Sequence, residues 1–391
     1  MAFRFITAGE SHGPCLTAIV EGVPAGLSLD EAMFRTDLAR RQLKAGAGGR
    51  MDIETDRVVI LSGVMAGKTT GAPIALQIPN RDHAHWQGKE VSAYTVARPG
   101  HADMAACVKY GFDDIRCALE RSSARETACR VAVGTVARAF LRAFGIEAGA
   151  YVASLGPVKE VPMTGDGAFD FAKDSPLRAP NAEQEAAFAD AIRDARKAGE
   201  TLGGVLVCRV TGLPVGLGSY ATPERRLDAR IGGAVLAMNA VKGVEFAEAF
   251  ANTAVPGSEL HDPILTDGKG HFGRSSNHAG GLEAGMTNGE PLVVRAAMKP
   301  IPTTLKPQQS VDFATGEPAE TQYERSDTCP VPRACVVLES IVLTELASAL
   351  LEKLGGDSMG ECKARFDALP TIGGLRLSPD AKVFWPGPDG D

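Results

Sequence analysis

The chain has 391 residues, of which 44% are hydrophobic, and carries a formal net charge of −7 with an isoelectric point near 5.6. This length and apolar content are sufficient to bury a substantial core. The acidic balance argues against a nucleic-acid or membrane binder, because such proteins usually present a basic face, so we expect a small-molecule partner.

Cysteine spacing and the N-terminal sequence exclude further classes. The eight cysteines contain no C-x-x-C pair, so neither a zinc site nor a disulfide framework is indicated, and we expect reduced thiols and no metal. The segment after Met1 lacks a basic stretch followed by an apolar one, and we find no run of about 18 apolar residues. We therefore expect a cytoplasmic protein.

Hydrophobic periodicity predicts helices and strands mixed without strict βαβ alternation. In chain order, strands are expected at 15–21, 57–62 and 73–78, helices at 124–144 and 182–198, strands at 203–210 and 291–298, and a helix at 335–354. Each helix is followed by a glycine suited to a C-terminal cap: Gly145, Gly199 and Gly355. The stretches 212–230 and 299–334 are predicted to be long ordered loops, which usually carry function. The pattern favours an α+β fold in one folded unit.

Three segments resemble known sites but lack a required feature. Gly63–Thr69 has three residues between its glycines where a P-loop needs four, and 46–49 lacks the third glycine of a dinucleotide fingerprint. His83 and His85 beside Trp86 form a histidine pair on a polar loop, which is more often solvated than metal-bound. We assign none of these segments a role.

The functional signal is a set of segments rich in glycine, serine and arginine that do not fit a hydrophobic core. They are GESHG at 9–13, RRQLKAGAGGRM at 40–51, RPGHAD at 98–103, RSSARET at 121–127, KPIPTTLKP at 299–307 and RSDTCPVPRA at 325–334. Arginine suits bidentate binding of carboxylate and phosphate, so clustered arginines in an acidic protein indicate a small polyanionic ligand. The alternative is that these arginines are exposed and only aid solubility.

Two histidines in these segments lie on tight backbone next to glycine. His12 sits between Ser11 and Gly13, and His101 follows the dipeptide 99–100. Neither lies on an apolar face, and a histidine in such a place can move protons near neutral pH. The local sequence leaves a catalytic and a non-catalytic interpretation equally open for each.

Seven segments together resemble the motifs of chorismate synthases, in the order in which that family carries them. They are GESHG, GGRMDIETD, RPGHAD, RSSARETACRVAVG, LDARIGGAVLAMNAVKGVEF, NHAGGLEAGMTNGEPLVVRAAMKPIPT and RSDTCPVPRACVVLESIVL, from residue 5 to about residue 355. The resemblance implies a β-α-β sandwich in a single domain over 1–391, with 356–391 a less certain C-terminal extension, assembled as a homotetramer. It also implies a lyase that converts 5-enolpyruvylshikimate-3-phosphate to chorismate and phosphate with reduced FMN, in the shikimate pathway to aromatic amino acids.

The resemblance also assigns roles to individual residues. Proton transfer falls on His12 and His101, with Ser11 and Ser123 ordering the proton network and Asp327 taking the proton from flavin N5. Flavin contacts fall on Arg121, Ser122, Ser123, Asn239, Ala240, Ala284, Lys299, Pro300, Ile301, Pro302, Thr303 and Arg325. Substrate contacts fall on Arg40 or Arg41, with Arg41 favoured, and on Arg50.

One departure from the family motif concerns the substrate. Where many members read GYGRGGRM, this chain reads KAGAGGRM, so Ala47 takes the place of a substrate-facing arginine. Lys44 and Arg50 are candidates for the missing charge, and the sequence does not choose between them.

The reaction implied by the resemblance explains why a flavin is needed. A trans 1,4-elimination expels phosphate from C3 and removes an unactivated hydrogen from C6, which no ordinary base removes at neutral pH. Reduced flavin lends electron density, phosphate leaves first, and no net redox occurs. By the family's pattern, His12 protonates the departing phosphate and His101 protonates the reduced flavin.

The rival enzyme class is a flavin oxidoreductase. Such an enzyme also surrounds FMN with arginine and serine, but it consumes a nicotinamide cofactor stoichiometrically. The chain has no recognisable nicotinamide-binding motif, so we expect an external flavin reductant. Whether the chain can also reduce its own flavin is left open by the sequence.

Overall fold

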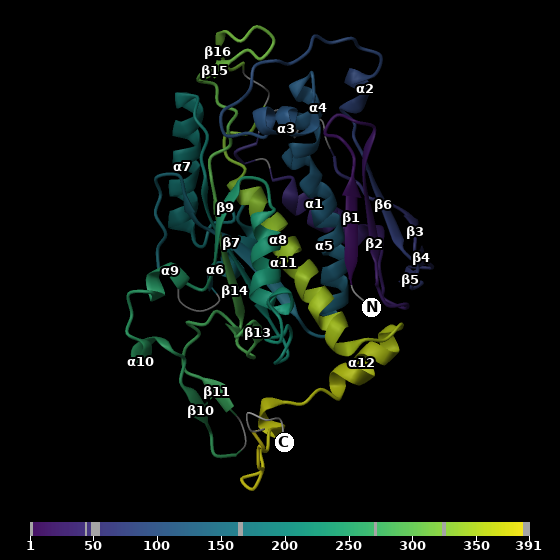
Figure 1. Cartoon of the computed structure of the whole chain (residues 1–391), viewed down its shortest axis with the longest axis vertical. Coiled ribbons are helices and arrows are strands. Elements are labelled where there is room, and N and C mark those ends of the chain that lie inside the picture. Colours follow the sequence, from purple (N-terminus) through teal and green to yellow (C-terminus); the bar gives the residue numbers. More distant parts are fainter. Residues whose placement is uncertain are drawn as a thin grey trace.

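Two antiparallel four-stranded sheets enclose a layer of helices (Figure 1). This arrangement is that of a computed structural model, which describes residues 3–43, 45–47, 55–162, 167–269, 272–322 and 326–385. Two long helices, α5 (Thr127–Arg142) and α11 (Val331–Leu354), run side by side between the sheets. The expected α+β fold of the β-α-β sandwich type is confirmed.

The first sheet packs against α5. Its strand order is β1-β2-β6-β3, formed by Arg4–Ala8, Cys15–Glu21, Ile74–Pro79 and Val59–Ser62. Alternate residues of the inner strands, such as Leu16 and Leu76, are only 1% exposed and face the helices, as the period of two in a strand requires. The short turn between β1 and β2 holds residues 9–14, which include the GESHG segment.

The second sheet packs against α11. Its order is β7-β8-β14-β9, formed by Glu147–Leu155, Gly204–Thr211, Leu292–Met298 and Val241–Phe246. Because β14 and β9 are antiparallel and Met298 pairs with Val241, the last residue of β14 lies beside the first residue of β9. The segments 239–240 and 299–303 therefore lie at this same end of the strands.

The two central helices approach each other closely at one glycine. A Cβ added to Gly134 of α5 would lie 2.3 Å from the Cβ of Ser340 on α11. Two further helices, α1 (Glu31–Arg41) and α8 (Leu227–Leu236), pack against this pair. The core therefore lies between the sheets, along α5 and α11.

Helix α11 is long and apolar enough to cross a membrane by length and composition alone. Its most apolar window has a mean hydropathy of 1.9, but 94% of that window is buried inside the protein. A helix that is apolar on all sides is also typical of a buried core helix. Polar residues such as Arg333, Glu339 and Glu345 interrupt it, so it is not an unbroken apolar run, and its burial in the sandwich accounts for its composition.

The remaining elements lie around the sandwich. They are β4 (Val64–Met65), β5 (Lys68–Thr69), α2 (His83–Trp86), α3 (Asp103–Tyr110), α4 (Ile115–Ser122), α6 (Gly167–Asp174), α7 (Ala182–Ala198), α9 (Ala249–Asn252), α10 (Gly257–Leu260), β10 (Ile264–Thr266), β11 (Phe272–Arg274), β12 (Leu282–Glu283), β13 (Met286–Thr287), β15 (Gln309–Val311), β16 (Pro318–Glu320) and α12 (Met359–Asp367). Short 3₁₀ turns occupy Ala124–Glu126, Pro223–Arg225 and Ile372–Gly374.

All eight elements predicted from periodicity are present; β2 and α7 have the predicted ends, and the others differ at one or both ends by one to four residues. Helix α11 begins at Val331, four residues earlier than predicted, because proline is tolerated in a first helical turn. The predicted loop 299–334 contains the hairpin β15–β16, and the predicted loop 212–230 contains the start of α8. The glycine-containing segment 63–69 forms the hairpin β4–β5 with no helix after it, so it lacks the helix N-terminus of a P-loop.

Candidate active site

The turn between β1 and β2 carries Ser11 and His12 and is fixed to the end of α4. The backbone N–H of Ser11 donates to the carbonyl of Glu120 at 3.1 Å. The side-chain amide of Asn80 donates to two carbonyls of the same turn, at 3.1 and 2.9 Å. The turn is therefore held from two sides, by α4 and by the end of β6.

His12 is oriented by carboxylates. Its Nδ1 lies 2.6 Å from Glu120 Oε1, while its backbone N–H donates to Glu120 Oε2 at 2.7 Å. Its Nε2 lies 3.8 Å from Asp82 Oδ2, and its ring centroid is 4.8 Å from that of Trp86. Since a carboxylate accepts hydrogen bonds, Glu120 places a proton on Nδ1 and leaves Nε2 as the ring atom that can exchange one.

The histidine pair that the sequence left without a role lies beside this turn. His83 Nδ1 is 2.9 Å from the carbonyl oxygen of His12, whereas His85 is exposed and lies 3.3 Å from Asp82. Within the described residues, no group of three or more metal-ligating side chains gathers here or elsewhere. His83 therefore supports the backbone of His12, which corrects the expectation that both histidines are merely solvated.

His101 is held in the same manner as His12. Its Nδ1 contacts the carboxylate of Asp103, which is fully buried at the start of α3. Arg98 donates to both oxygens of Asp103, at 2.9 and 3.0 Å. Burial alone would raise the pKa of Asp103, but hydrogen bonds from His101 and Arg98 outweigh it and hold the pKa well below its usual range. Asp103 thus stays charged and fixes the His101 ring.

The RSS segment at the end of α4 connects the two sheets. Ser123 Oγ lies 3.1 Å from Ser11 Oγ, so the two predicted serines do meet. Arg121 donates to Thr7 on β1, and the amide of Asn239 donates to the carbonyl of Ser122 at 2.9 Å. The predicted flavin contacts 121–123 and 239 therefore lie together.

The run from Lys299 to Thr303 joins this group from the second sheet. The Lys299 backbone N–H donates to the Ala240 carbonyl at 2.9 Å, and its Nζ donates to the Gly100 carbonyl at 2.6 Å. Thr303 Oγ1 accepts a hydrogen bond from Arg98 at 3.4 Å. The hydroxyl of Thr201 donates to the Ile301 carbonyl at 2.7 Å. The segments 98–103, 239–240 and 299–303 thus form one wall.

Arg41 and Arg125 form a cationic cluster next to Ser123. Arg41 donates to the Ala124 carbonyl at 3.1 Å and lies 3.2 Å from Asp56, which also pairs with Arg125. Burial lowers the pKa of Arg41 to about 10, although Asp56 acts in the opposite direction. An arginine with that pKa remains charged at neutral pH. The cluster therefore places two buried cations beside the serines of the site.

Asp327 pairs with an arginine that the sequence did not single out. Its carboxylate contacts the guanidinium of Arg333, on the first turn of α11. The charges of both residues act on Arg41, which places them close to that arginine. Arg325, one of the predicted flavin contacts, lies outside the described residues, as do Lys44 and Arg50.

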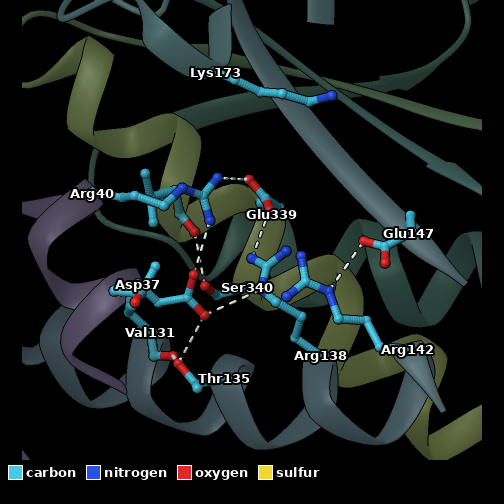
Figure 2. A network of polar contacts seen from close by, with 12 residues as sticks. Asp37, Arg40, Val131, Thr135, Arg138, Arg142, Glu147, Lys173, Glu339 and Ser340 are labelled. Atoms are coloured by element: carbon cyan, nitrogen blue, oxygen red, sulfur yellow. Dashed lines mark hydrogen bonds and ion pairs between the residues drawn. The ribbon is translucent and has the colours of Figure 1, made fainter. Parts of the chain in front are cut away.

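Arg40 belongs to a different network, in the core (Figure 2). Its guanidinium lies 2.9 Å from Asp37 and 2.6 Å from Glu339, and Arg138 pairs with the same two carboxylates at 3.1 and 2.6 Å. Glu339 is 1% exposed; burial raises its pKa, but Arg138 and Arg40 outweigh that effect and lower it overall. The substrate contact expected on Arg40 or Arg41 therefore fits Arg41, because Arg40 is committed to core carboxylates.

Ala284 is not brought to the other predicted residues. It lies in the turn between β12 and β13 with φ +50, and the next strand, β14, separates it from Lys299. The seven residues of β14 span about 20 Å at the usual rise per residue. Figure 1 shows β13 beyond the opposite end of that strand. A single chain therefore does not place Ala284 in the wall that carries Lys299.

A cavity of about 690 Å³ lies away from these residues, between α1, α5 and α12. Its lining includes Asp37 and Arg138 of the core network, together with Met33, Met359 and Lys363. None of the residues that surround His12 or His101 lines it, so this cavity is separate from the two histidine sites.

Comparison with known proteins identifies the family. The family model described as chorismate synthase matches residues 3–351. The chain belongs to the chorismate synthase family. The resemblance carried by the sequence motifs is thereby confirmed, and with it the expected enzyme class, a lyase of aromatic biosynthesis.

Individual chorismate synthases match over almost their whole length. That of Chlorobaculum tepidum is 49% identical over 383 residues, which cover 93% of this chain and 96% of the relative. That of Geobacter metallireducens is 50% identical over 385 residues, covering 93% and 97%. A chorismate synthase crystal structure superimposes with a TM-score of 0.78 at 41% identity, over 94% of this chain and 97% of that one.

Several residues of the site escaped the sequence reasoning. They are Asp56, Asn80, Asp82, Trp86, Asp103, Glu120 and Arg333. Four had a local signal: Asp56 ends the GGRMDIETD segment, Asp103 and Arg333 lie in RPGHAD and RSDTCPVPRA, and Glu120 directly precedes the RSS segment. The roles of the other three depend on contacts between distant parts of the chain.

Proposed function

We propose that the chain converts 5-enolpyruvylshikimate-3-phosphate to chorismate and phosphate by trans 1,4-elimination with bound reduced FMN. The observation that carries this proposal is the convergence of two carboxylate-held histidines, His12 and His101, with a cluster of buried arginines. A substrate with one phosphate and two carboxylates calls for several guanidinium donors. An elimination also calls for groups that give and take protons at fixed positions.

The residues present fit reduced FMN. Lys299 and Arg121 bring cationic groups to the junction of Ser122 and Asn239, which suits a phosphate-bearing cofactor. The Nε of Arg333 is buried and has no hydrogen-bond partner among the described residues. Because buried donors are normally paired, this atom fits a site in which a bound molecule supplies an acceptor. When bound, the reduced flavin supplies the electron density that lets phosphate leave from C3.

The protein's own groups handle the protons. Glu120 holds the proton of His12 on Nδ1, so a protonated His12 can donate from Nε2 to the departing phosphate. Asp103 holds the His101 ring beside the wall formed by Lys299 and its neighbours, where His101 keeps the flavin in its correct protonation state. The carboxylate of Asp327 would accept a proton from the bound flavin, the role that the family resemblance assigns to it.

The arginines bind the substrate. Arg41 and Arg125 share Asp56, so part of their charge is left for an anion next to Ser123. Their burial strengthens such contacts, because charged hydrogen bonds are stronger away from water. We assign the substrate contact to Arg41 in place of Arg40.

The setting of the enzyme follows from the family. We propose a cytoplasmic homotetramer that receives reduced FMN from an external reductant, with no separate nicotinamide site in the chain. Anaerobic incubation with chemically reduced FMN and 5-enolpyruvylshikimate-3-phosphate tests the activity directly. We expect equal amounts of phosphate and chorismate, and absence of both products would refute the proposed function.

A further inference from the structure

Arg333 has an unusual environment for a buried arginine. Its side chain is 11% exposed and lies on the first turn of α11, where its backbone N–H donates to the Pro330 carbonyl at 3.1 Å. Its guanidinium contacts Asp327, and its Nε is buried without a partner among the described residues. A guanidinium has five N–H donors and needs acceptors when it is buried. Asp327 is the carboxylate that pairs with the Arg333 guanidinium in the described part of the chain.

The backbone next to Asp327 is fixed on two sides. Thr328 accepts a hydrogen bond from Leu202 at 3.0 Å, and the N–H groups of Thr328 and Cys329 both donate to the Gly46 carbonyl at 3.1 Å. Gly46 has φ +75, and a Cβ there would lie 2.5 Å from the Cys329 carbonyl oxygen, so only glycine fits. The main chain after Asp327 is therefore immobilised, and what remains to be fixed is the direction of its side chain.

We propose that Arg333 is a positioning residue for Asp327. The ion pair from α11 holds the Asp327 carboxylate in one orientation, on a backbone already clamped by Leu202 and Gly46. This inference rests on the proposed function, in which Asp327 accepts a proton. Arg333 thereby couples the core helix α11 to the reacting centre, without itself contacting the substrate.

The two residues should act as a unit. Misplacing a reacting group by about 1 Å can cost about 10²-fold in rate, so Arg333→Met should lower kcat by about 10- to 100-fold. In the Asp327→Asn background, Arg333→Met should cause no further loss beyond about twofold, because groups that act together are non-additive. The dissociation constant of 5-enolpyruvylshikimate-3-phosphate, measured by calorimetry with oxidised FMN, should stay within about threefold of wild type.

A matched control is an arginine that pairs with the same helix, α11, far from Asp327. Arg230 on α8 also pairs with carboxylates of α11, Glu345 and Glu352, and its side chain is 15% exposed. These partners lie 12 and 19 residues beyond Arg333 in sequence, about 18 and 28 Å along the helix. Arg230→Met should therefore lower the melting temperature while leaving kcat unchanged.

Two results with Arg333→Met would each overturn the inference by solution measurements alone: additive losses of kcat in the double variant, or a rise of the substrate dissociation constant of more than about tenfold with unchanged kcat. The second would mean that Arg333 binds the substrate itself. If the Arg333→Met variant does not fold, Arg333→Lys takes its place because it keeps the charge. For Arg333→Lys we expect a smaller loss of kcat with unchanged substrate affinity. Unchanged kcat in a folded Arg333→Lys variant whose crystal structure shows Asp327 turned away would also refute the positioning role.

The failure of this inference is distinguishable from failure of the proposed function. Wild-type protein that releases no phosphate would refute the function alone. Crystal structures of the wild type and of Arg333→Met report the direction of the Asp327 side chain without any turnover. An Asp327 carboxylate that points the same way in both structures would refute the positioning role of Arg333, whatever reaction the enzyme catalyses.

Discussion

Two arginine clusters touch α11, one in the core and one at the site, and they differ in charge balance. In the core, Arg40 and Arg138 face the two carboxylates Asp37 and Glu339 (Figure 2). At the site, Arg41 and Arg125 share the single carboxylate Asp56, while Arg333 of α11 is matched by Asp327. In the first cluster the charges of the arginines and carboxylates cancel. In the second, the arginines outnumber the carboxylates, so positive charge remains that can bind an anion. Charge balance thus separates a structural arginine from a ligand-binding one.

Adjacent residues of one helix supply both clusters. Arg40 and Arg41 end α1, and successive helical residues point about 100° apart. Arg40 therefore reaches Glu339 in the core, while Arg41 reaches Ala124 at the site. Four variants test whether the two clusters divide stability and function as this comparison implies.

The largest expected effect is on turnover, from Asp327→Asn. This change keeps the shape of the side chain and removes its basicity, so the flavin N5 proton loses its acceptor. We expect kcat to fall by at least about 10²-fold while reduced FMN and substrate still bind. Anaerobic stopped-flow absorbance follows the flavin while phosphate is assayed in parallel. Wild-type rates in both channels would reduce Asp327 to a structural partner of Arg333.

His12→Ala tests the histidine held by Glu120. Loss of a general acid typically costs about 10²-fold or more in rate, and flavin binding should be nearly intact. Steady-state phosphate release and an FMN titration measure the two quantities. Unchanged turnover would remove His12 from the mechanism.

Glu339→Gln should break the core cluster without touching the chemistry. Removing one partner of a buried ion pair costs about 3–5 kcal/mol, because the remaining charges of Arg40 and Arg138 stay buried. Urea unfolding should show this loss, while the KM of the folded variant is unchanged. A large rise of KM with unaltered stability would reverse the roles given to the two clusters.

The same carboxylate predicts a pH dependence of stability. The pKa of Glu339 is lowered in the folded protein, so its contribution is fully present above the ordinary glutamate pKa of about 4.3 and is lost as the pH falls toward the lowered native value. In acid, wild type and Glu339→Gln should therefore converge in free energy of unfolding.

Ala47→Arg should give the smallest effect. Ala47 follows Gly46, which is bonded to the backbone beside Asp327, so a new arginine adds to a site that already has excess positive charge. We expect substrate binding to tighten by about 1 kcal/mol at most, as for a partly exposed charged contact. Calorimetric titration measures the change. An unaltered or weaker affinity would mean that another residue already fills the role of the missing arginine.

Periodicity predicted the three longest helices of the described residues, α11, α7 and α5, but missed other elements for physical reasons. The helix α7 was predicted with its exact ends, since its N-cap Asn181 and C-cap Gly199 are visible in the sequence. Helix α1 was missed because it buries only Phe34, Leu38 and Asp37 and so lacks an apolar stripe. Strand β7 was missed because small residues fill its first half.

The candidate site was predictable where its residues lie in short motifs. The Ser11–Ser123 contact and the meeting of Asn239 with Ser122 agree with the resemblance, whose functional roles remain predictions. Glu120 was not predictable as the partner of His12, because the two are 108 residues apart in sequence. The division between Arg40 and Arg41 depends on which way each side chain leaves α1, which no motif specifies.

The most direct test is the number of products formed per flavin. Purified protein is given a small amount of chemically reduced FMN and excess 5-enolpyruvylshikimate-3-phosphate under anaerobic conditions, with no nicotinamide cofactor, and chorismate, phosphate and the flavin spectrum are followed together. We predict many chorismate and phosphate molecules per flavin, with the flavin still reduced at the end. One product per flavin, accompanied by flavin oxidation, would contradict an elimination without net redox.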